Sequence, residues 1–272
     1  MKRIVWIVSL LWWNIMGIQA QCPAVNNAFK GGESLEYEMF FNWKFVWVKA
    51  GTATLSTDSI LVENNQPGYQ TSLIATSSKR ADFFFKMRDT LVSRMTTRME
   101  PIYFRKGAEE GKRYTVDEAW FKYPEGKSHA HQRRLHKDGS ITETDNTMHE
   151  CIYDMLSILQ RARSFNPTSY KVGQHINFQM ATGRKVEKQT LIYRGKKNFE
   201  SEDENETVYR CLVFSLVEYT KKGKEKEVIT FYVTDDANHL PVRLDLYLNF
   251  GSAKAFLKNI KGNRHPLTSI VK

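Results

Sequence analysis

The alternation of side chains between residues 35 and 47 is the clearest pattern in this chain. Its odd-numbered positions are all apolar or aromatic, namely Leu35, Tyr37, Met39, Phe41, Trp43, Phe45 and Trp47. The even-numbered positions between them are mostly polar, with Phe40 and Val46 as exceptions. Successive side chains of a β-strand point to opposite faces, whereas a helix would scatter these aromatics around its circumference. The stripe therefore predicts one long strand with a buried or cavity-facing side.

Further segments of strand character follow, separated by turn-forming residues. We expect a turn at Lys49-Ala50-Gly51, so that residues 35–47 and 52–62 form a hairpin. The pair Asp138-Gly139 suits the tight turn of a second hairpin. That second hairpin covers residues 133–142, and the other predicted strands cover residues 69–77, 91–99, 114–123, 175–180, 188–194, 208–219, 228–233 and 242–250.

One segment near residues 150–165 has a helical pattern. Thr147 and Glu150 have the spacing of a capping box, and Asn166-Pro167 ends the pattern. Between them, apolar residues recur at helical spacing: Ile152, Met155, Leu156, Leu159 and Ala162. Many strands and one helix predict a mainly all-β protein, with a strongly curved antiparallel sheet or partly open barrel and one packed helix.

The N-terminus has the features of a secretory signal peptide. Lys2 and Arg3 precede a short apolar run, and Ala20 offers a small residue at a cleavage point. A retained membrane anchor is the alternative, but the run is short for a spanning helix. Lipid attachment at Cys22 is a third reading, which Gln21 disfavours. We expect residues 1–20 to be a signal peptide and 21–272 to form a single β-rich domain.

The cysteines and the charge fit an exported protein. The chain holds three cysteines, which predict one disulfide and one spare thiol, with the pairing among Cys22, Cys151 and Cys211 left open. The formal net charge is +10, an excess that attracts anionic lipid headgroups or acidic polysaccharide, or simply favours solubility. We expect no nucleic-acid partner, because an exported protein seldom meets one.

Two histidines have a spacing that metal sites use. His129 and His131 lie on one face of a predicted strand, and His136, His149, Glu150 and Cys151 are near in sequence. However, Lys127, Arg133, Arg134 and Lys137 surround the pair, and cations oppose a bound dication. We interpret the segment as an exposed basic strand and expect no metal and no cofactor.

Candidate catalytic groups are present without a complete motif. Ser157 and Asp154 lie one turn apart on the predicted helix, where a hydrogen bond on the helix surface explains both. Asp235-Asp236 and Asp89 are the best carboxylate candidates for a glycosidase, yet Asp235-Asp236 is typical of a turn. Arg161 and Arg163 are interpreted as favourable charge at the end of the helix, with an anion-binding site and a buried arginine–Asp154 pair as alternatives. We expect no catalytic residue and no enzyme.

Several of these segments together resemble a bacterial family of exported proteins known as domain of unknown function 3108. The matching residues, in family order, are Gly32-Glu33, Leu35, Tyr37, Ala50-Gly51-Thr52, Phe83-Phe84, Asp89, Asp154-Met155-Leu156-Ser157, Arg161, Arg163, Gly173-Gln174, Thr234-Asp235-Asp236, Leu240-Pro241-Val242, Gly251-Ser252-Ala253 and Leu257. The resemblance implies an envelope protein with a mostly antiparallel β fold, located in the periplasm or associated with the outer membrane. It implies no activity.

The aromatic stripe supplies the functional hypothesis. Bulky side chains on one strand of a curved sheet favour an apolar concavity, and binding sites are mostly apolar. We therefore predict that a lipid-like ligand, hydrophobic or amphipathic, binds to Tyr37, Phe41, Trp43, Phe45 and Trp47. Peripheral membrane contact through basic residues at the rim is part of this hypothesis. The alternatives are a packed core in an envelope assembly protein that binds a partner chain, and a hydrolase without a recognised motif.

Overall fold

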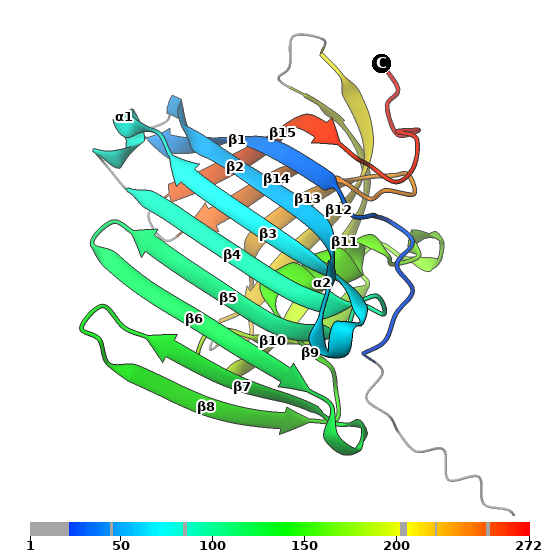
Figure 1. The fold of residues 1–272 in the computed structure, drawn as a ribbon. Helices are drawn as coiled ribbons and strands as arrows, with labels where there is room; N and C mark the ends of the chain where they lie inside the picture. The colour runs from blue at the N-terminus through cyan, green and yellow to red at the C-terminus, as the bar shows by residue number, and fades with distance from the viewer. Residues whose placement is uncertain (1–21, 44–45, 84–85, 202–205, 221, 249–250) are drawn as a thin grey trace, which may run out of the picture.

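The computed structural model describes residues 22–43, 46–83, 86–201, 206–220, 222–248 and 251–272 (Figure 1). The predicted signal peptide lies outside these residues. The strands are β1 (Glu33–Trp43), β2 (Val46–Leu61), β3 (Pro67–Ser77), β4 (Met87–Thr96), β5 (Pro101–Glu110), β6 (Arg113–Lys122), β7 (Ser128–Leu135), β8 (Ile141–Met148), β9 (Ile152–Tyr153), β10 (His175–Ala181), β11 (Val186–Glu200), β12 (Val208–Tyr219), β13 (Glu225–Thr234), β14 (Pro241–Leu248) and β15 (Gly251–Lys261). Two α-helices, α1 (Lys79–Asp82) and α2 (Met155–Arg163), accompany them, with short 3-10 turns at Glu63–Asn65, Pro124–Gly126 and Pro167–Ser169.

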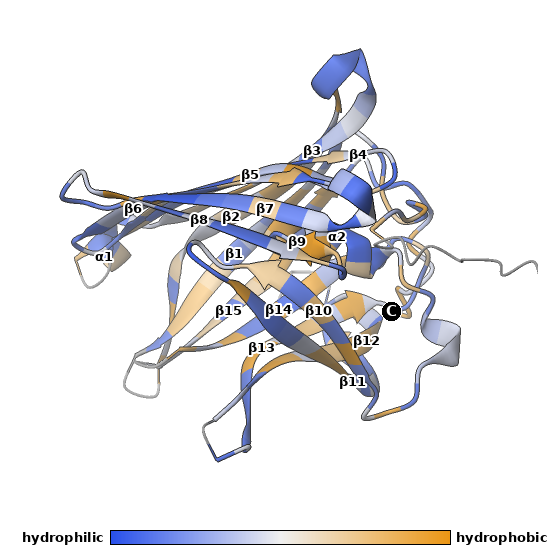
Figure 2. Cartoon of the chain, turned by 90° about the horizontal axis from the view of Figure 1, so that it is seen from below, coloured by the Kyte–Doolittle hydropathy of each residue, from blue (hydrophilic) through white to orange (hydrophobic). Residues whose placement is uncertain are grey.

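All of these strands form one sheet, in the order β8-β7-β6-β5-β4-β3-β2-β1-β15-β14-β13-β12-β11-β10-β9. Neighbours are antiparallel except β9 and β10, which are parallel. The sheet curls until its two edges approach one another (Figure 2). The Ile152 amide of β9 donates to Ser128 Oγ of β7 at 3.1 Å, and Thr144 Oγ1 of β8 donates to the Arg184 carbonyl at 2.9 Å. The predicted curved, barrel-like antiparallel sheet is confirmed.

The two ends of this barrel differ. At one end, here the helix end, β1 and β3 begin, β2 and β4 end, and α2 lies inside the curved sheet (Figure 1). The other end, here the far end, holds α1, the ends of β1, β5, β7, β10 and β12, and the starts of β2, β6, β8, β11 and β13. The largest buried cluster joins Leu156 of α2 to residues of many strands, among them Leu35, Phe104 and Leu240. The helix therefore fills the barrel mainly from one end.

The first hairpin turns earlier than the sequence predicts. β1 ends at Trp43 and β2 begins at Val46, so the expected turn at residues 49–51 is wrong and Trp47 belongs to β2. Gly51 pairs with Met39 inside the sheet. A Cβ at Gly51 would lie 2.1 Å from the Thr76 carbonyl oxygen, so this glycine permits a close approach of two strands.

Other boundaries also move. The predicted capping box at Thr147 and Glu150 is wrong, because Thr147 continues β8 and pairs with His129 of β7. Tertiary pairing overrides the local signal there. β15 was not predicted, although it joins β14 to β1 and so unites the two halves of the sheet. Within the described residues, no helix has the length and apolar character needed to cross a membrane.

Candidate functional site

The start of α2 is fixed to the wall of the barrel. Asp154 is the N-cap, and its Oδ1 accepts from the amides of Leu156 and Ser157 at 2.9 Å each. In return, Ser157 Oγ accepts from the Asp154 amide at 2.9 Å, which completes a capping box. The second carboxylate oxygen of Asp154 accepts from Ser93 of β4 at 2.8 Å. Asp154 and Ser157 thus hold the helix in place, and burial raises the pKa of Asp154 against these hydrogen bonds.

The end of α2 carries a buried polar face toward β1, β2 and β3. Gln160 is fully buried and donates to the hydroxyls of Thr57 at 2.8 Å and Thr71 at 3.2 Å. Arg163 forms a two-bond ion pair with Glu33, and both side chains are 2% exposed. The expectation that Arg163 is surface charge at a helix end is therefore wrong. These buried hydrogen bonds fix the orientation of α2 against β1, β2 and β3.

An apolar cavity of about 260 Å³ lies between α2 and the second half of the sheet. Its walls come from α2, from the segment that follows it, and from β10 to β14. The lining residues are Leu73, Met155, Leu156, Ile158, Leu159, Ala162, Arg163, Phe165, Pro167, Tyr170, Phe178, Met180, Leu191, Leu212, Phe214, Leu216, Ile229, Phe231, Val233, His239, Pro241, Leu244 and Leu246. The cavity is larger than the ~150 Å³ that suffices for benzene in an engineered protein core.

The apolar side chains of the sheet wall are incompletely packed. Phe214, Leu216, Ile229, Phe231 and Leu246 are only half-buried, although they are large and point to a shared interior. Cross-strand pairs bring them together, as Leu216 pairs with Ile229 and Ile229 pairs with Leu246. Solvent therefore reaches apolar surface inside the barrel, and covering that surface with an apolar ligand is favourable.

Three polar side chains lie along this cavity at the helix end. Arg163 is engaged by Glu33, and His239 Nδ1 bonds to the Arg163 carbonyl. Burial raises the pKa of the Tyr170 hydroxyl to about 12, so this group is protonated at neutral pH. The accessible lining of the cavity is almost entirely hydrocarbon, with polar side chains only at this end, which suits the apolar part of a ligand.

The five residues predicted to bind a ligand lie outside these walls or outside the described side chains. Tyr37 is buried and its hydroxyl donates to the Pro241 carbonyl at 2.9 Å, one residue layer from the cavity. Phe41 is half-buried, whereas Trp47 is exposed on β2 with the Lys254 ammonium 4.2 Å above its ring. The side chains of Trp43 and Phe45 are not among those described. Ligand binding by this set stays a prediction.

The other candidate groups serve local contacts. His129 Nε2 and His131 Nδ1 approach the same Asp145 carboxylate at 3.2 and 3.1 Å. Asp235 bonds to Lys196 at 2.8 Å and to Arg210 at 3.1 Å. Asp236 is buried and accepts from the amide of Asn238 and the hydroxyls of Thr234 and Ser269, as a turn residue does. Among the described residues no group of three or more potential ligands is placed to hold a metal ion.

The disulfide pairing, which the sequence left open, is Cys22 with Cys151. It ties the start of the described chain to the residue before β9, next to α2. Cys211 is free and fully buried in β12, and burial raises its thiol pKa to about 12. A buried thiol of this kind is chemically inert.

The residues that line the cavity are not among the ligand-binding residues predicted from the sequence. Their signal was nevertheless present in the predicted strands 208–219, 228–233 and 242–250, where large apolar residues occupy alternate positions. The stripe of residues 35–47 drew attention because its aromatics are bulkier. No local sequence pattern predicts the buried hydrogen bonds of Glu33 and Gln160, because their partners are remote in sequence.

The chain belongs to the family described as Protein of unknown function (DUF3108), whose model matches residues 36–258. Among solved structures it is similar to a beta-barrel-like protein of domain of unknown function DUF1849 from Brucella abortus, with a TM-score of 0.55 and 7% sequence identity over 88% of this chain and 100% of that one. A weaker likeness, with a TM-score of 0.34 and 10% identity over 88% and 99% of the two chains, is to a candidate exported protein with a YmcC-like fold from Bacteroides fragilis. No curated protein sequence matches this chain.

Proposed function

We propose that this protein is a non-catalytic binding protein of the bacterial cell envelope that holds a lipid-like ligand in the cavity beside α2. The main support for this proposal is the cavity of about 260 Å³. Its walls are hydrocarbon side chains apart from Arg163, Tyr170 and His239. Protein interiors are normally close-packed, so an unfilled apolar space of this size supports a ligand-binding role.

The chemistry of the walls indicates the class of ligand. The sheet wall of β12, β13 and β14 offers only apolar side chains, which suit an acyl chain or a comparable hydrocarbon group. The polar groups at the helix end suit a headgroup that exchanges hydrogen bonds with Tyr170 and His239. An amphipathic molecule satisfies both regions, and it would bury the half-exposed apolar surface of Leu216 and its neighbours.

Two features support an exported location. The leader-like residues 1–20 precede the domain, and the Cys22–Cys151 disulfide requires an oxidising compartment such as the periplasm. The proposal that the protein is not an enzyme rests on the roles already taken by Asp154, Ser157 and Asp236, which cap a helix and close a turn.

The test is binding of a fluorescent fatty-acid probe to residues 21–272 and its displacement by unlabelled lipids. Leu216→Glu places a charge in the cavity and should abolish probe binding, because an unpaired carboxylate opposes an apolar ligand. Leu61→Glu is the matched control, since Leu61 is exposed at the helix end and outside the cavity. Ala162→Phe should weaken binding by filling space without adding charge. Equal probe binding by all of these proteins would overturn the proposal.

A further inference from the structure

The exposed aromatic side chains gather at one end of the molecule. Among the described residues, the solvent-exposed aromatic side chains are Trp47, Phe83, Tyr114, Tyr219 and Tyr247. Each lies where β2, β6, β12 or β14 begins or ends, or in the connection after α1, and all of these positions belong to the far end. Phe83 is 87% exposed. Solvated aromatics confined to one end mark a contact surface.

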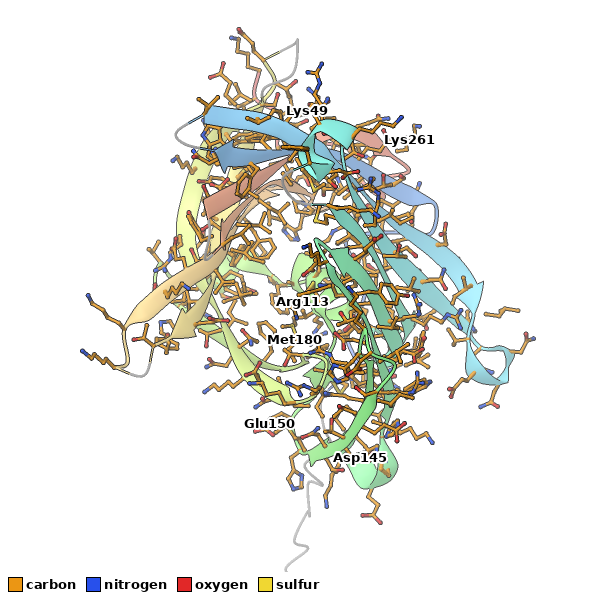
Figure 3. The ribbon with its side chains drawn as sticks, turned by 90° about the vertical axis from the view of Figure 1, so that its left-hand side faces the viewer. Lys49, Arg113, Asp145, Glu150, Met180 and Lys261 are labelled. Carbon is orange, nitrogen blue, oxygen red and sulfur yellow. A yellow bond between two sulfur atoms is a disulfide. The ribbon has the colours of Figure 1, made fainter. Side chains whose placement is uncertain are left out.

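Cations accompany these aromatics. Lys79 and Arg80 lie in α1, Lys112 in the turn before β6, Arg113 at the start of β6, and Lys137 in the turn before β8. All five are exposed, and no described carboxylate lies within ion-pair distance of them. Arg113 is labelled in Figure 3, which views the barrel from the far end.

Two of the nearby carboxylates, Asp82 and Glu109, are paired with other cations, whereas Asp138, next to Lys137, accepts hydrogen bonds from Ser140. Asp82 pairs with Arg88, and the resulting hydrogen bonds hold the pKa of Asp82 below its usual range. Glu109 pairs with Lys86 at 2.7 Å. The five unpaired cations therefore leave the far end with an excess of positive charge, in a chain whose formal net charge is +10.

From this juxtaposition we propose that the far end docks on the surface of an anionic phospholipid bilayer. Trp and Tyr favour the boundary between headgroups and acyl chains, and each basic residue near an anionic surface adds attraction. Trp47 combines both features of this surface, because the Lys254 ammonium lies over one face of its exposed ring. The docking surface is separate from the cavity walls, so this inference does not depend on the proposed ligand.

The experiment is sedimentation of the full mature chain with vesicles of equimolar phosphatidylglycerol and phosphatidylcholine, and with vesicles of phosphatidylcholine alone. The protein should bind only the anionic vesicles. Binding should fall steeply between about 0.1 M and about 1 M salt, because the Debye length shortens from ~10 Å to ~3 Å. No binding to the anionic vesicles at low salt would overturn the proposal.

Two double variants locate the surface. Lys112→Glu/Arg113→Glu should reduce affinity for anionic vesicles by roughly tenfold or more, as expected for charges close to an anionic surface. Trp47→Ser/Phe83→Ser should reduce it without changing the salt dependence. The matched controls at the helix end, Lys30→Glu/Lys122→Glu and Leu61→Ser/Val172→Ser, should bind as the parent does.

Circular dichroism should show that every variant is folded. The cavity variant Leu216→Glu should still bind vesicles, which separates docking from ligand uptake. If the far-end variants bind vesicles normally and instead lose a protein partner or self-association, the surface serves a protein and the proposal is wrong.

Discussion

Arg163 and Glu33 form a buried ion pair that joins the end of α2 to the start of β1. Arg163 Nη1 and Nη2 bond to the two carboxylate oxygens of Glu33 at 2.5 and 2.9 Å, and each side chain is 2% exposed. The guanidinium also donates to the Asn238 carbonyl at 3.1 Å and lies over the ring of Phe29. One arginine thus fastens three remote segments around the helix end of the barrel.

Breaking this pair should be costly. Glu33→Gln or Arg163→Met should lower the free energy of unfolding by about 3–5 kcal/mol, because the remaining charge stays buried without its partner. Urea denaturation with a spectroscopic readout measures the change. The double replacement Glu33→Met/Arg163→Met should recover much of the loss, since a buried pair can be exchanged for apolar residues at little cost. Single variants within about 0.5 kcal/mol of the parent would refute this role.

The disulfide should contribute stability through the long segment it closes. Cys22 and Cys151 are 129 residues apart, so loss of the cross-link frees a large loop in the unfolded chain. Cys22→Ser/Cys151→Ser should lose about 2–5 kcal/mol of unfolding free energy. Reduction of the parent should produce the same change. Cys211→Ala, which leaves the cross-link intact, should respond to reductant as the parent does, whereas Cys22→Ser/Cys151→Ser should not respond. A reductant-insensitive parent would contradict the assignment.

Asp89 predicts a measurable dependence of stability on pH. Burial raises its pKa from 3.8 to about 6, and the nearby Lys106 ammonium only partly offsets this. The folded state therefore holds the proton more tightly than the unfolded chain, so stability from this group is present below about pH 4 and is lost as pH rises through about 6. The loss is up to about 3 kcal/mol. The stability of Asp89→Asn should change less between about pH 4 and pH 6 than that of the parent, as measured by urea midpoints. Parallel plots of stability against pH for the two proteins would contradict this prediction.

The strands were predictable because alternation is a local property of the sequence. Residues 69–77, 114–123 and 208–219 lie within a residue or two of β3, β6 and β12. The tip of the β7–β8 hairpin was predictable from Asp138-Gly139, and Gly139 indeed has a positive φ of 84°. Turn chemistry and alternation thus located most of the sheet.

What the sequence did not predict depends on contacts between remote segments. The turn predicted at Gly51 is wrong because a glycine that allows two strands to approach has the same local signature as one that reverses the chain. Arg163 was placed in solvent because its partner Glu33 is 130 residues away. The cavity lies where α2 leaves the inner face of β12–β14 uncovered. Its position depends on how the whole sheet curves, which no local sequence pattern predicts.

The cavity should also be visible in the stability of its lining. Leu216 is half-buried against the cavity, so Leu216→Ala should cost less than about 1 kcal/mol, because few packed atoms surround the side chain. Leu35 is fully buried in the main core, and Leu35→Ala should cost about 2–5 kcal/mol. Thermal and urea unfolding compare the two. An equal, large loss for both would mean that the lining of the cavity is packed core.

Native mass spectrometry of residues 21–272 purified from a bacterial periplasm tests whether the cavity beside α2 holds a lipid-like molecule. We predict a complex heavier than the polypeptide by one extractable amphipathic molecule, and a clearly smaller bound fraction for Ala162→Phe. A bare polypeptide mass, unchanged after incubation with a panel of lipids, would contradict the claim.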